Sequence, residues 1–404
     1  MNGEKRYTVY GSPELERRIG RLVAGVADVV REEVEARSLR ALILIGGYGR
    51  GEGGVEITAR GQRPHNNLDF LLVLEDRAGA SGPELKTRLD RRISEDAETD
   101  GVGIDISTIT VGRLRRSPAL VIWYDMRFGH KTILGDASFA PSLRQFQVDR
   151  LLNTDVAELL VNRGTLLVLN DLIREDGHPS AESERAVVRH AVKGIIGYGD
   201  ALLYQLGAYH WSYVEKRDRM AGRKDIPASF RALYLEAAAF RLRPDYRAFA
   251  LRDLDDWLRR ARVELEQVHL RVESLRLGVT ALTWEDYPRI ALRHGALSEL
   301  GVPRRAARKI VNLARSSGHP DAGSLREALG YRCAGPHGLL PLAFPVVAYD
   351  LPDERYRRLA ATVLGTGTSQ VELRRAYVRK WGVLKDFNLS GSLGRLGIRL
   401  EEAA

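Results

Sequence analysis

The stretch of sequence that decides the fold is residues 41–76, ALILIGGYGRGEGGVEITARGQRPHNNLDFLLVLED. An apolar run over residues 40–45 ends at two consecutive glycines. A second apolar run, residues 68–74, follows a Gly-rich polar stretch over residues 52–66. Short apolar runs bounded by turn signals are typical of buried β-strands, so this stretch predicts two strands separated by a loop or hairpin.

The residues on either side of this stretch complete a small domain. Apolar residues recur at helical spacing before it, and residues 102–110 after it alternate between apolar and polar, as in a strand with one solvated face. The predicted helices cover residues 13–37, 82–96 and 117–127, and the further predicted strands cover residues 102–110 and 131–134. Together they predict a small domain with a mixed sheet over residues 1–140.

From about residue 145 the pattern changes to helices. One long helix is predicted over residues 183–217, and breaks rich in Gly, Pro and Ser are predicted at residues 177–180, 316–322 and 333–341. The fold class predicted for the whole chain is therefore α+β, with a small mixed-sheet domain followed by an all-α region.

Composition limits the classes of protein to which the chain can belong. The 404 residues are 44% hydrophobic and 28% charged, which excludes a disordered chain. Cys333 is the only cysteine, so neither a disulfide framework nor a cysteine-based zinc site can form within one chain. No apolar run is long enough for a membrane span, so we expect no membrane partner and a cytoplasmic location.

The net charge of +9 is unevenly distributed along the chain. Residues 1–140 hold equal numbers of basic and acidic residues, so the whole excess belongs to residues 141–404. A basic surface attracts nucleic acid or another anionic partner, which makes RNA a candidate. A general preference for arginine in the composition is the alternative explanation, because arginine far outnumbers lysine.

Polar side chains gather at the start of the second apolar strand. Asn67 and Asp69 are two residues apart and therefore point to the same side of a strand. Asp105, between apolar residues of a neighbouring strand, can complete a cluster of three oxygen ligands, the kind that Mg²⁺ prefers. The pair Gly46-Gly47 lets backbone N–H groups approach a phosphate closely. These are the parts of a phosphoryl- or nucleotidyl-transfer site.

The ordered combination resembles the nucleotidyltransferase fold of the polymerase-beta-like superfamily, in the style of its minimal and antibiotic-modifying members. There, a strand, a Gly-Ser or Gly-Gly pair and an Arg-Gly-Glu triplet are followed by Asp-x-Asp on the next strand and by a third Asp. The resemblance covers about residues 38–136. The matching residues are Gly46-Gly47, Arg50-Gly51-Glu52, Asp69, Asp105 and the segment KTILGD at residues 131–136.

The resemblance implies an enzyme that transfers NMP from an NTP to a hydroxyl acceptor and releases pyrophosphate. Mg²⁺ would be the cofactor, with Mn²⁺ as a substitute, and ATP is the default nucleotide; the acceptor would be a small molecule, a protein or RNA. Gly46 and Gly47 would hold the triphosphate. Asn67 and Asp69 would hold the metal that bridges the β- and γ-phosphates. Asp105 would complete a second metal site and activate the acceptor hydroxyl.

Two residues beside the glycine pair have less certain roles in this scheme. Arg50 is either a nucleotide-binding residue that contacts phosphate or a structural contact of the turn. Glu52 is expected to be a hydrogen-bonding partner of the turn and not a ligand. The polar stretch that follows, up to Asn67, is expected to be an exposed hairpin, with a lid or acceptor-recognition loop as the alternative.

Asn67 departs from the family pattern, because the family has an aspartate at that position. Its amide oxygen can coordinate a cation but brings no charge, so two Mg²⁺ ions would share two carboxylates where the family supplies three. Three explanations stay open: a natural inactive or one-metal enzyme, a retuned metal site, or an engineered change that traps a substrate complex. The alternative function is a catalytically inactive nucleotidyltransferase-like module that binds or senses a nucleotide.

The resemblance also implies that a helical domain covers the cleft. Residues 141–280 would form that domain, and residues 281–404 a C-terminal helical subdomain. By analogy with the family, Lys193 and then Lys216 would contact phosphates, and Ser212 would be a further nucleotide-binding residue. In the alternative interpretation the lysines are solvated and the neighbouring aromatic residues belong to the core. Asp200, among apolar residues, would need a partner such as Lys193 or His210.

Overall fold

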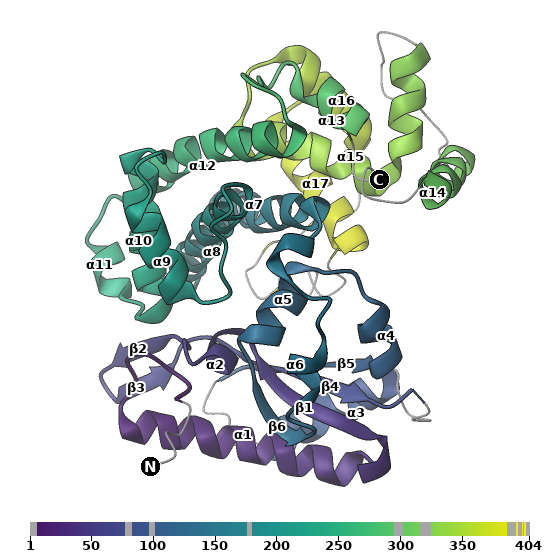
Figure 1. Cartoon of the computed structure of the whole chain (residues 1–404). Coiled ribbons are helices and arrows are strands. Elements are labelled where there is room, and N and C mark those ends of the chain that lie inside the picture. The colour runs from purple at the N-terminus through teal and green to yellow at the C-terminus, as the bar shows by residue number, and fades with distance from the viewer. Residues whose placement is uncertain are drawn as a thin grey trace. The chain divides into compact units, whose positions relative to one another are not determined.

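The chain is a mixed α+β protein, as predicted, with a small sheet near the N-terminus followed by a helical region (Figure 1). The computed structural model describes residues 6–76, 83–96, 102–175, 180–294, 302–315, 325–385, 393, 394, 398 and 400. Two compact units divide the chain. Unit 1 comprises Met1–Leu152, Tyr209–Arg223 and Leu235–Asp245, and unit 2 comprises Asn153–Ala208, Lys224–Tyr234 and Tyr246–Ala404.

A four-stranded sheet forms the centre of unit 1. Its strand order is β5-β4-β1-β6, and the strands are β1 (Leu39–Ile45), β4 (Leu68–Leu74), β5 (Ile104–Thr110) and β6 (Lys131–Gly135). β4 is antiparallel to β1 and parallel to β5, while β6 is antiparallel to β1. All four strands lie where the apolar runs predict them. The segment between β1 and β4 contains the hairpin β2 (Val55–Thr58) and β3 (Gly61–Pro64), so the prediction of a hairpin there is confirmed.

The hydrophobic core of unit 1 covers one face of the sheet, so a functional site is expected on the opposite face. Even-numbered residues of β1 and β4, such as Leu44 and Phe70, pack with the apolar stripe of α1 (Pro13–Glu33) and with α3 (Pro83–Asp96) (Figure 1). Because side chains alternate along a strand, odd-numbered residues point to the opposite face. The remaining helices of unit 1 before residue 152 are short: α2 (Gly46–Arg50), α4 (Val111–Arg116), α5 (Val121–Phe128) and α6 (Phe139–Ser142).

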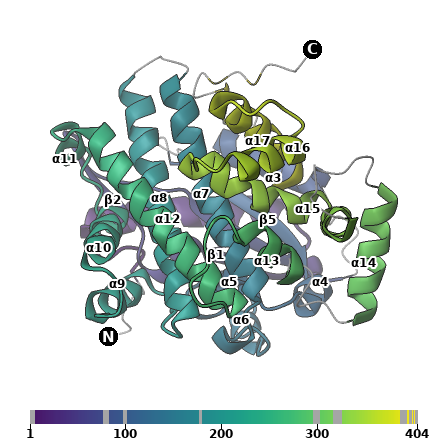
Figure 2. The same ribbon diagram turned by 90° about the horizontal axis from the view of Figure 1, so that it is seen from above.

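Unit 2 is helical. Its longest helices include α7 (Asn153–Glu175) and α8 (Ala181–Gln205), which pack side by side, and α12 (Leu254–Leu277), which packs against α8 (Figure 2). The C-terminal part contains α13 (Tyr287–His294), α14 (Val302–Arg315), α15 (Leu325–Tyr349), α16 (Glu354–Leu364) and α17 (Gln370–Lys385). The shorter helices between are α9 (Tyr213–Gly222), which belongs to unit 1, α10 (Ala228–Leu242), which both units share, and α11 (Tyr246–Ala250).

The prediction of one continuous helix over residues 183–217 is wrong. α8 ends at Gln205, and Gly207 follows with a φ of 68°. The amide of Gly207 bonds to the carbonyl of Tyr204, and the amide of Ala208 reaches back to the carbonyl of Leu203. This pattern is the Schellman ending, in which a glycine adopts the left-handed conformation at little cost. The chain then leaves unit 2 and returns to unit 1 as α9.

The unit boundaries also differ from the predicted domains over 1–140, 141–280 and 281–404. Unit 1 extends to Leu152 and includes two later segments, whose side chains pack on the small domain as described below. The break predicted at residues 333–341 is a kink at Gly335, with a φ of 66°, inside α15. No helix of the described residues is long and apolar enough to cross a membrane. The cytoplasmic location and RNA as a partner stay predictions.

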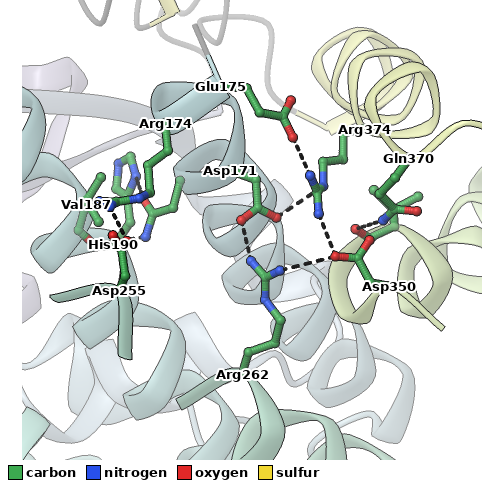
Figure 3. Close-up of polar contacts among 12 residues, drawn as sticks. Asp171, Arg174, Glu175, Val187, His190, Asp255, Arg262, Asp350, Gln370 and Arg374 are labelled. Carbon is green, nitrogen blue, oxygen red and sulfur yellow. Dashed lines mark hydrogen bonds and ion pairs between the residues drawn. The ribbon is translucent and has the colours of Figure 1, made fainter. Parts of the chain in front are cut away.

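A cluster of charges around the buried Arg374 joins three helices of unit 2 (Figure 3). Arg374 on α17 forms ion pairs with Asp171 at 3.2 Å, with Asp350 at 2.8 Å and with Glu175. Arg262 on α12 pairs with Asp171 and lies 3.6 Å from Asp350. Burial raises the pKa of Asp171, although the neighbouring guanidinium groups act to lower it. Each arginine of the cluster thus has carboxylate partners from other segments.

Candidate active site

Two carboxylates lie side by side at one end of the sheet. Asp69 on β4 is the register partner of Asp105 on β5, and the strands are parallel. Residues in register on neighbouring strands point to the same face, and the strands are about 4.8 Å apart. The following residues of both strands, Phe70 and Ile106, are buried in the core on the α1 face, so the two carboxylates point to the opposite face. Asp105 is exposed, and its side chain makes no hydrogen bond or ion pair within the described part of the chain.

Asn67 lies at the same end of the sheet. It comes directly before β4 and is exposed. A Cβ atom added to Gly103 would collide with the Asn67 side-chain oxygen, so this side chain lies against the residue that precedes β5. The amide of Leu68 donates to the carbonyl of Gly103 at 2.9 Å, which extends the pairing of the strands to this point. The predicted metal ligands Asn67, Asp69 and Asp105 therefore lie at the same end of two neighbouring strands.

The glycine turn after β1 approaches the carboxylate of Asp69. Gly46 has a φ of 67°, which favours glycine, and a Cβ atom at this position would lie 2.6 Å from Asp69 Oδ2. Ile45, the residue before it, is the register partner of Asp69 on β1. Gly47 is buried, and its carbonyl accepts a hydrogen bond from the amide of Glu52 at 2.8 Å. Only glycine at residue 46 fits both the backbone conformation and the nearby carboxylate.

Arg50 makes structural contacts in this arrangement. Its guanidinium forms a buried ion pair with Asp125 on α5 at 2.7 Å and lies 4.8 Å from the centre of the Tyr213 ring. Burial is the largest single influence and acts to lower the pKa of Arg50, but Asp125, Tyr213, Tyr209 and Glu52 together outweigh it, so this pKa lies above its usual value. Of the two roles that the sequence allows for Arg50, the contacts fit the structural one, and we assign it no phosphate contact.

Glu52 attaches α9 to the small domain. Its carboxylate is 6% exposed, accepts hydrogen bonds from the amides of Tyr213 at 2.7 Å and Val214 at 3.4 Å, and accepts another from the Ser212 hydroxyl. Ser212 is the N-cap of α9, and its hydroxyl oxygen accepts from the amide of Glu215. A carboxylate at a helix N-terminus satisfies free amides and interacts favourably with the helix dipole. Ser212 and Glu52 thus have a shared structural role that the sequence did not suggest.

Lys216 is enclosed by aromatic rings of its own segment. Its side chain is only 1% exposed, and the ammonium lies 4.8 Å from the centre of the Tyr209 ring and 4.3 Å from that of Tyr213. Tyr209 in turn donates a hydrogen bond to Asp125 at 3.0 Å. Cation–π contacts of this kind stabilise a buried ammonium group. The alternative interpretation of this segment is therefore wrong for Lys216, which is buried and not solvated, whereas Tyr209 is a core residue as that interpretation expected.

Lys193 and Asp200 belong to unit 2, on α8. Lys193 is exposed, whereas Asp200 is buried and accepts a hydrogen bond from the Tyr234 hydroxyl at 2.9 Å. The sequence gives no local signal for Tyr234 as the partner of this carboxylate, because the two residues lie on different helices. The predicted phosphate contact of Lys193 stays a prediction, because it joins residues of different units.

Arg241 is a residue of the site that sequence reasoning missed. It lies in the last turn of α10, in the part of this helix that belongs to unit 1. A Cβ atom at Gly47 would lie 3.2 Å from Arg241 Nη2, so the guanidinium is next to the glycine turn. The guanidinium carbon of Arg241 lies 4.9 Å from the centre of the Tyr213 ring. Among the described residues no carboxylate lies within 4.0 Å of this guanidinium.

The oxygen atoms at the ends of β4 and β5 suit one hard divalent cation. Two carboxylates and an amide oxygen are ligand types that Mg²⁺ uses, together with water and substrate phosphates. The described residues contain no cluster of three or more His, Cys, Asp or Glu with a geometry for metal binding. Asn67 supplies an amide oxygen at the position where an aspartate would supply a third carboxylate. The donor set therefore fits a weaker site than a three-carboxylate cluster.

Comparisons with known proteins do not identify the family. No family model matches the chain, and the search of curated proteins finds none with significant similarity. The resemblance to nucleotidyltransferases thus depends on the sequence motif and on the arrangement of the residues described above.

Proposed function

We propose that the protein is a Mg²⁺-dependent nucleotidyltransferase that moves NMP from an NTP to a hydroxyl acceptor. The observation that carries the proposal is the placement of Asp69 and Asp105 in register on parallel strands, with the Gly46 turn against Asp69. A metal ligand pair next to a close backbone approach is what transfer of a phosphorus-containing group requires. The acceptor is a small molecule, a protein or RNA, and ATP is the default nucleotide.

In this proposal Asp69, Asp105 and the amide oxygen of Asn67 hold the cation, which neutralises negative charge on the phosphates when bound. The turn at Gly46 and Gly47, which lies against Asp69, would bind the triphosphate through its backbone amides. Asp105, which is exposed and has no partner among the described residues, accepts the proton of the acceptor hydroxyl. The acceptor oxygen forms a bond to the α-phosphorus. The bond from the α-phosphorus to the oxygen that bridges to the β-phosphate breaks, and pyrophosphate leaves with that electron pair.

Asn67 favours a second candidate function. With one carboxylate fewer than the family pattern, the site could bind a nucleotide without transferring it, as a sensor module does. The two candidates share the site and differ only in turnover, so one assay separates them.

The test follows pyrophosphate release from each of the four NTPs with Mg²⁺ or Mn²⁺, for the wild type, Asn67→Asp and Asp105→Asn. The acceptor is unidentified, so RNA, a mixture of small alcohols including aminoglycosides, and the protein itself as acceptor are compared. We expect release by the wild type or by Asn67→Asp, and a loss of about 10²- to 10⁴-fold in Asp105→Asn. Nucleotide binding without pyrophosphate release in both the wild type and Asn67→Asp would support the sensor. Absence of nucleotide binding in both would refute both candidate functions.

A further inference from the structure

We infer that Arg241 binds the polyphosphate of the nucleotide and supplies the positive charge that a second metal ion supplies elsewhere, so that the site operates with a single divalent cation. This inference rests on the proposed function, since it concerns the same site. It assigns a role to a residue far from the motif in sequence and gives a physical account of Asn67.

The position of Arg241 is the first observation. Asp69 Oδ2 lies against Gly46, and Arg241 Nη2 lies against Gly47, so a carboxylate and a guanidinium are located at consecutive residues of one turn. Both charges act on the Tyr48 hydroxyl. Burial raises the pKa of Tyr48 to about 12, and among its charged neighbours Arg241 acts to lower this pKa while Asp69 acts to raise it. A phosphate group that contacts the glycine turn would therefore lie within reach of the guanidinium.

The surroundings of Arg241 are the second observation. The nearby Arg50 is neutralised by Asp125, whereas no carboxylate pairs with Arg241 in the parts of the chain that the structure describes. The Tyr213 ring contacts Arg50, Lys216 and Arg241 at 4.8, 4.3 and 4.9 Å. Arg241 is half-buried, and a half-buried guanidinium with no carboxylate partner among the described residues is available to an anionic ligand. A nucleotide polyphosphate, recognised by the bidentate geometry of a guanidinium, is an anion of suitable charge.

A charge count connects Arg241 with Asn67. Replacing an aspartate by asparagine removes one negative charge, and omitting one Mg²⁺ removes two positive charges. The site then has one positive charge fewer than a site with two metals and three carboxylates. The single positive charge of the Arg241 guanidinium restores the net charge that faces the polyphosphate. Asn67, which weakens the second cation site, and Arg241, which replaces its charge, are in this account two parts of one arrangement.

The experiment measures nucleotide binding by calorimetry and bound Mn²⁺ by electron paramagnetic resonance, and needs no turnover. The probes are the four NTP analogues with a methylene group between the α- and β-phosphates, and the corresponding NMPs. The variants are Arg241→Gln, Arg241→Lys and, as the matched control, Arg243→Gln, which changes an exposed arginine two residues away. Circular dichroism and thermal unfolding check that each variant is folded.

We expect one bound Mn²⁺ per chain with the preferred analogue. Arg241→Gln should weaken binding of that analogue about 10- to 100-fold while leaving NMP binding within twofold, because a charged hydrogen bond to the phosphates is lost. Arg241→Lys should recover part of the affinity, and Arg243→Gln should bind like the wild type. Equal losses for the analogue and the NMP, equal binding by Arg241→Gln and Arg243→Gln, or two Mn²⁺ per wild-type chain would overturn the inference. Absence of nucleotide binding by the wild type would refute the proposed function as well, so the two failures are distinguishable.

Discussion

Two groups of charges, the cluster around Arg374 in unit 2 and the candidate site in unit 1, differ in how they are neutralised. In unit 2, Arg262 and Arg374 are surrounded by carboxylates from other segments (Figure 3). In unit 1, Arg241 and Asp105 have no ion pair within the described residues, although one lies beside the glycine turn and the other at the end of the neighbouring strands. Charges that neutralise one another hold a structure together, whereas charges left without a partner are available to a ligand. The cluster in unit 2 therefore has a structural role, whereas the charges at the end of the sheet in unit 1 are available for the proposed function.

The largest expected effect on stability is in the cluster of unit 2. Arg374→Met should lower the free energy of unfolding by about 3–5 kcal/mol, because it takes one of two guanidinium partners from the largely buried carboxylate of Asp171. Urea unfolding measures this loss. The matched control is Arg289→Met, which removes an exposed ion pair with Asp286 and should cost at most about 1 kcal/mol. Equal losses for the two variants would mean that the cluster has no special structural role.

Acid should destabilise unit 2 through His269. This side chain is buried, its Nδ1 lies 2.9 Å from the Tyr349 hydroxyl, and burial lowers its pKa from 6.5 to about 4. Between these two values the unfolded chain binds a proton that the folded protein does not, so stability falls as the pH is lowered from about 6.5 to 4. The loss amounts to about 3 kcal/mol at pH 4.

His269→Gln removes the titrating group and retains a polar side chain. As the pH falls from 7.5 to 4, we expect the wild type to lose more unfolding free energy than the variant does. The measurement is a series of urea titrations at half-unit steps. A difference that stays constant over this range would show that His269 does not carry the acid sensitivity.

A smaller effect is expected where α9 joins unit 1. Glu52→Gln weakens the hydrogen bonds to Ser212 and Tyr213 and should lower stability by about 1–3 kcal/mol. Hydrogen exchange of the first turn of α9 should become faster, while that of α8 stays unchanged. Glu215→Gln, at a half-exposed carboxylate that pairs with Arg219, is the control and should leave the first turn protected. Unchanged exchange in Glu52→Gln would remove this residue from the attachment of α9.

Local patterns predicted the sheet well and the long-range contacts poorly. The strands follow from short apolar runs ended by glycine, and the nearness of Asp69 to Asp105 follows from alternation once the strands are neighbours. The predicted helix over residues 183–217 failed because Gly207 is a lone stop signal inside an apolar pattern, and only its hydrogen bonds show the end of α8. The capping of α9 by Glu52 joins residues 160 positions apart, which no local rule indicates.

Arg241 illustrates the same limit at the candidate site. It is one of many arginines in the chain, and the sequence around it gives no signal of a site. Its importance comes from the return of the chain to unit 1 after residue 234 and from the space that Gly47 leaves for it. The motif therefore predicts the carboxylates and the glycines, whereas only the three-dimensional structure places Arg241 beside them.

The measurement that tests the central claim most directly is the affinity for an NTP with and without Mn²⁺, in the wild type, Asp105→Asn and Asp286→Asn. Calorimetric titration with the methylene analogues gives both dissociation constants. The account predicts that Mn²⁺ strengthens nucleotide binding in the wild type. Asp286→Asn, which changes a carboxylate of unit 2, should respond to Mn²⁺ like the wild type. In Asp105→Asn, the factor by which Mn²⁺ strengthens binding should be at least tenfold smaller. Binding that does not respond to Mn²⁺, or that responds equally in Asp105→Asn, would contradict it.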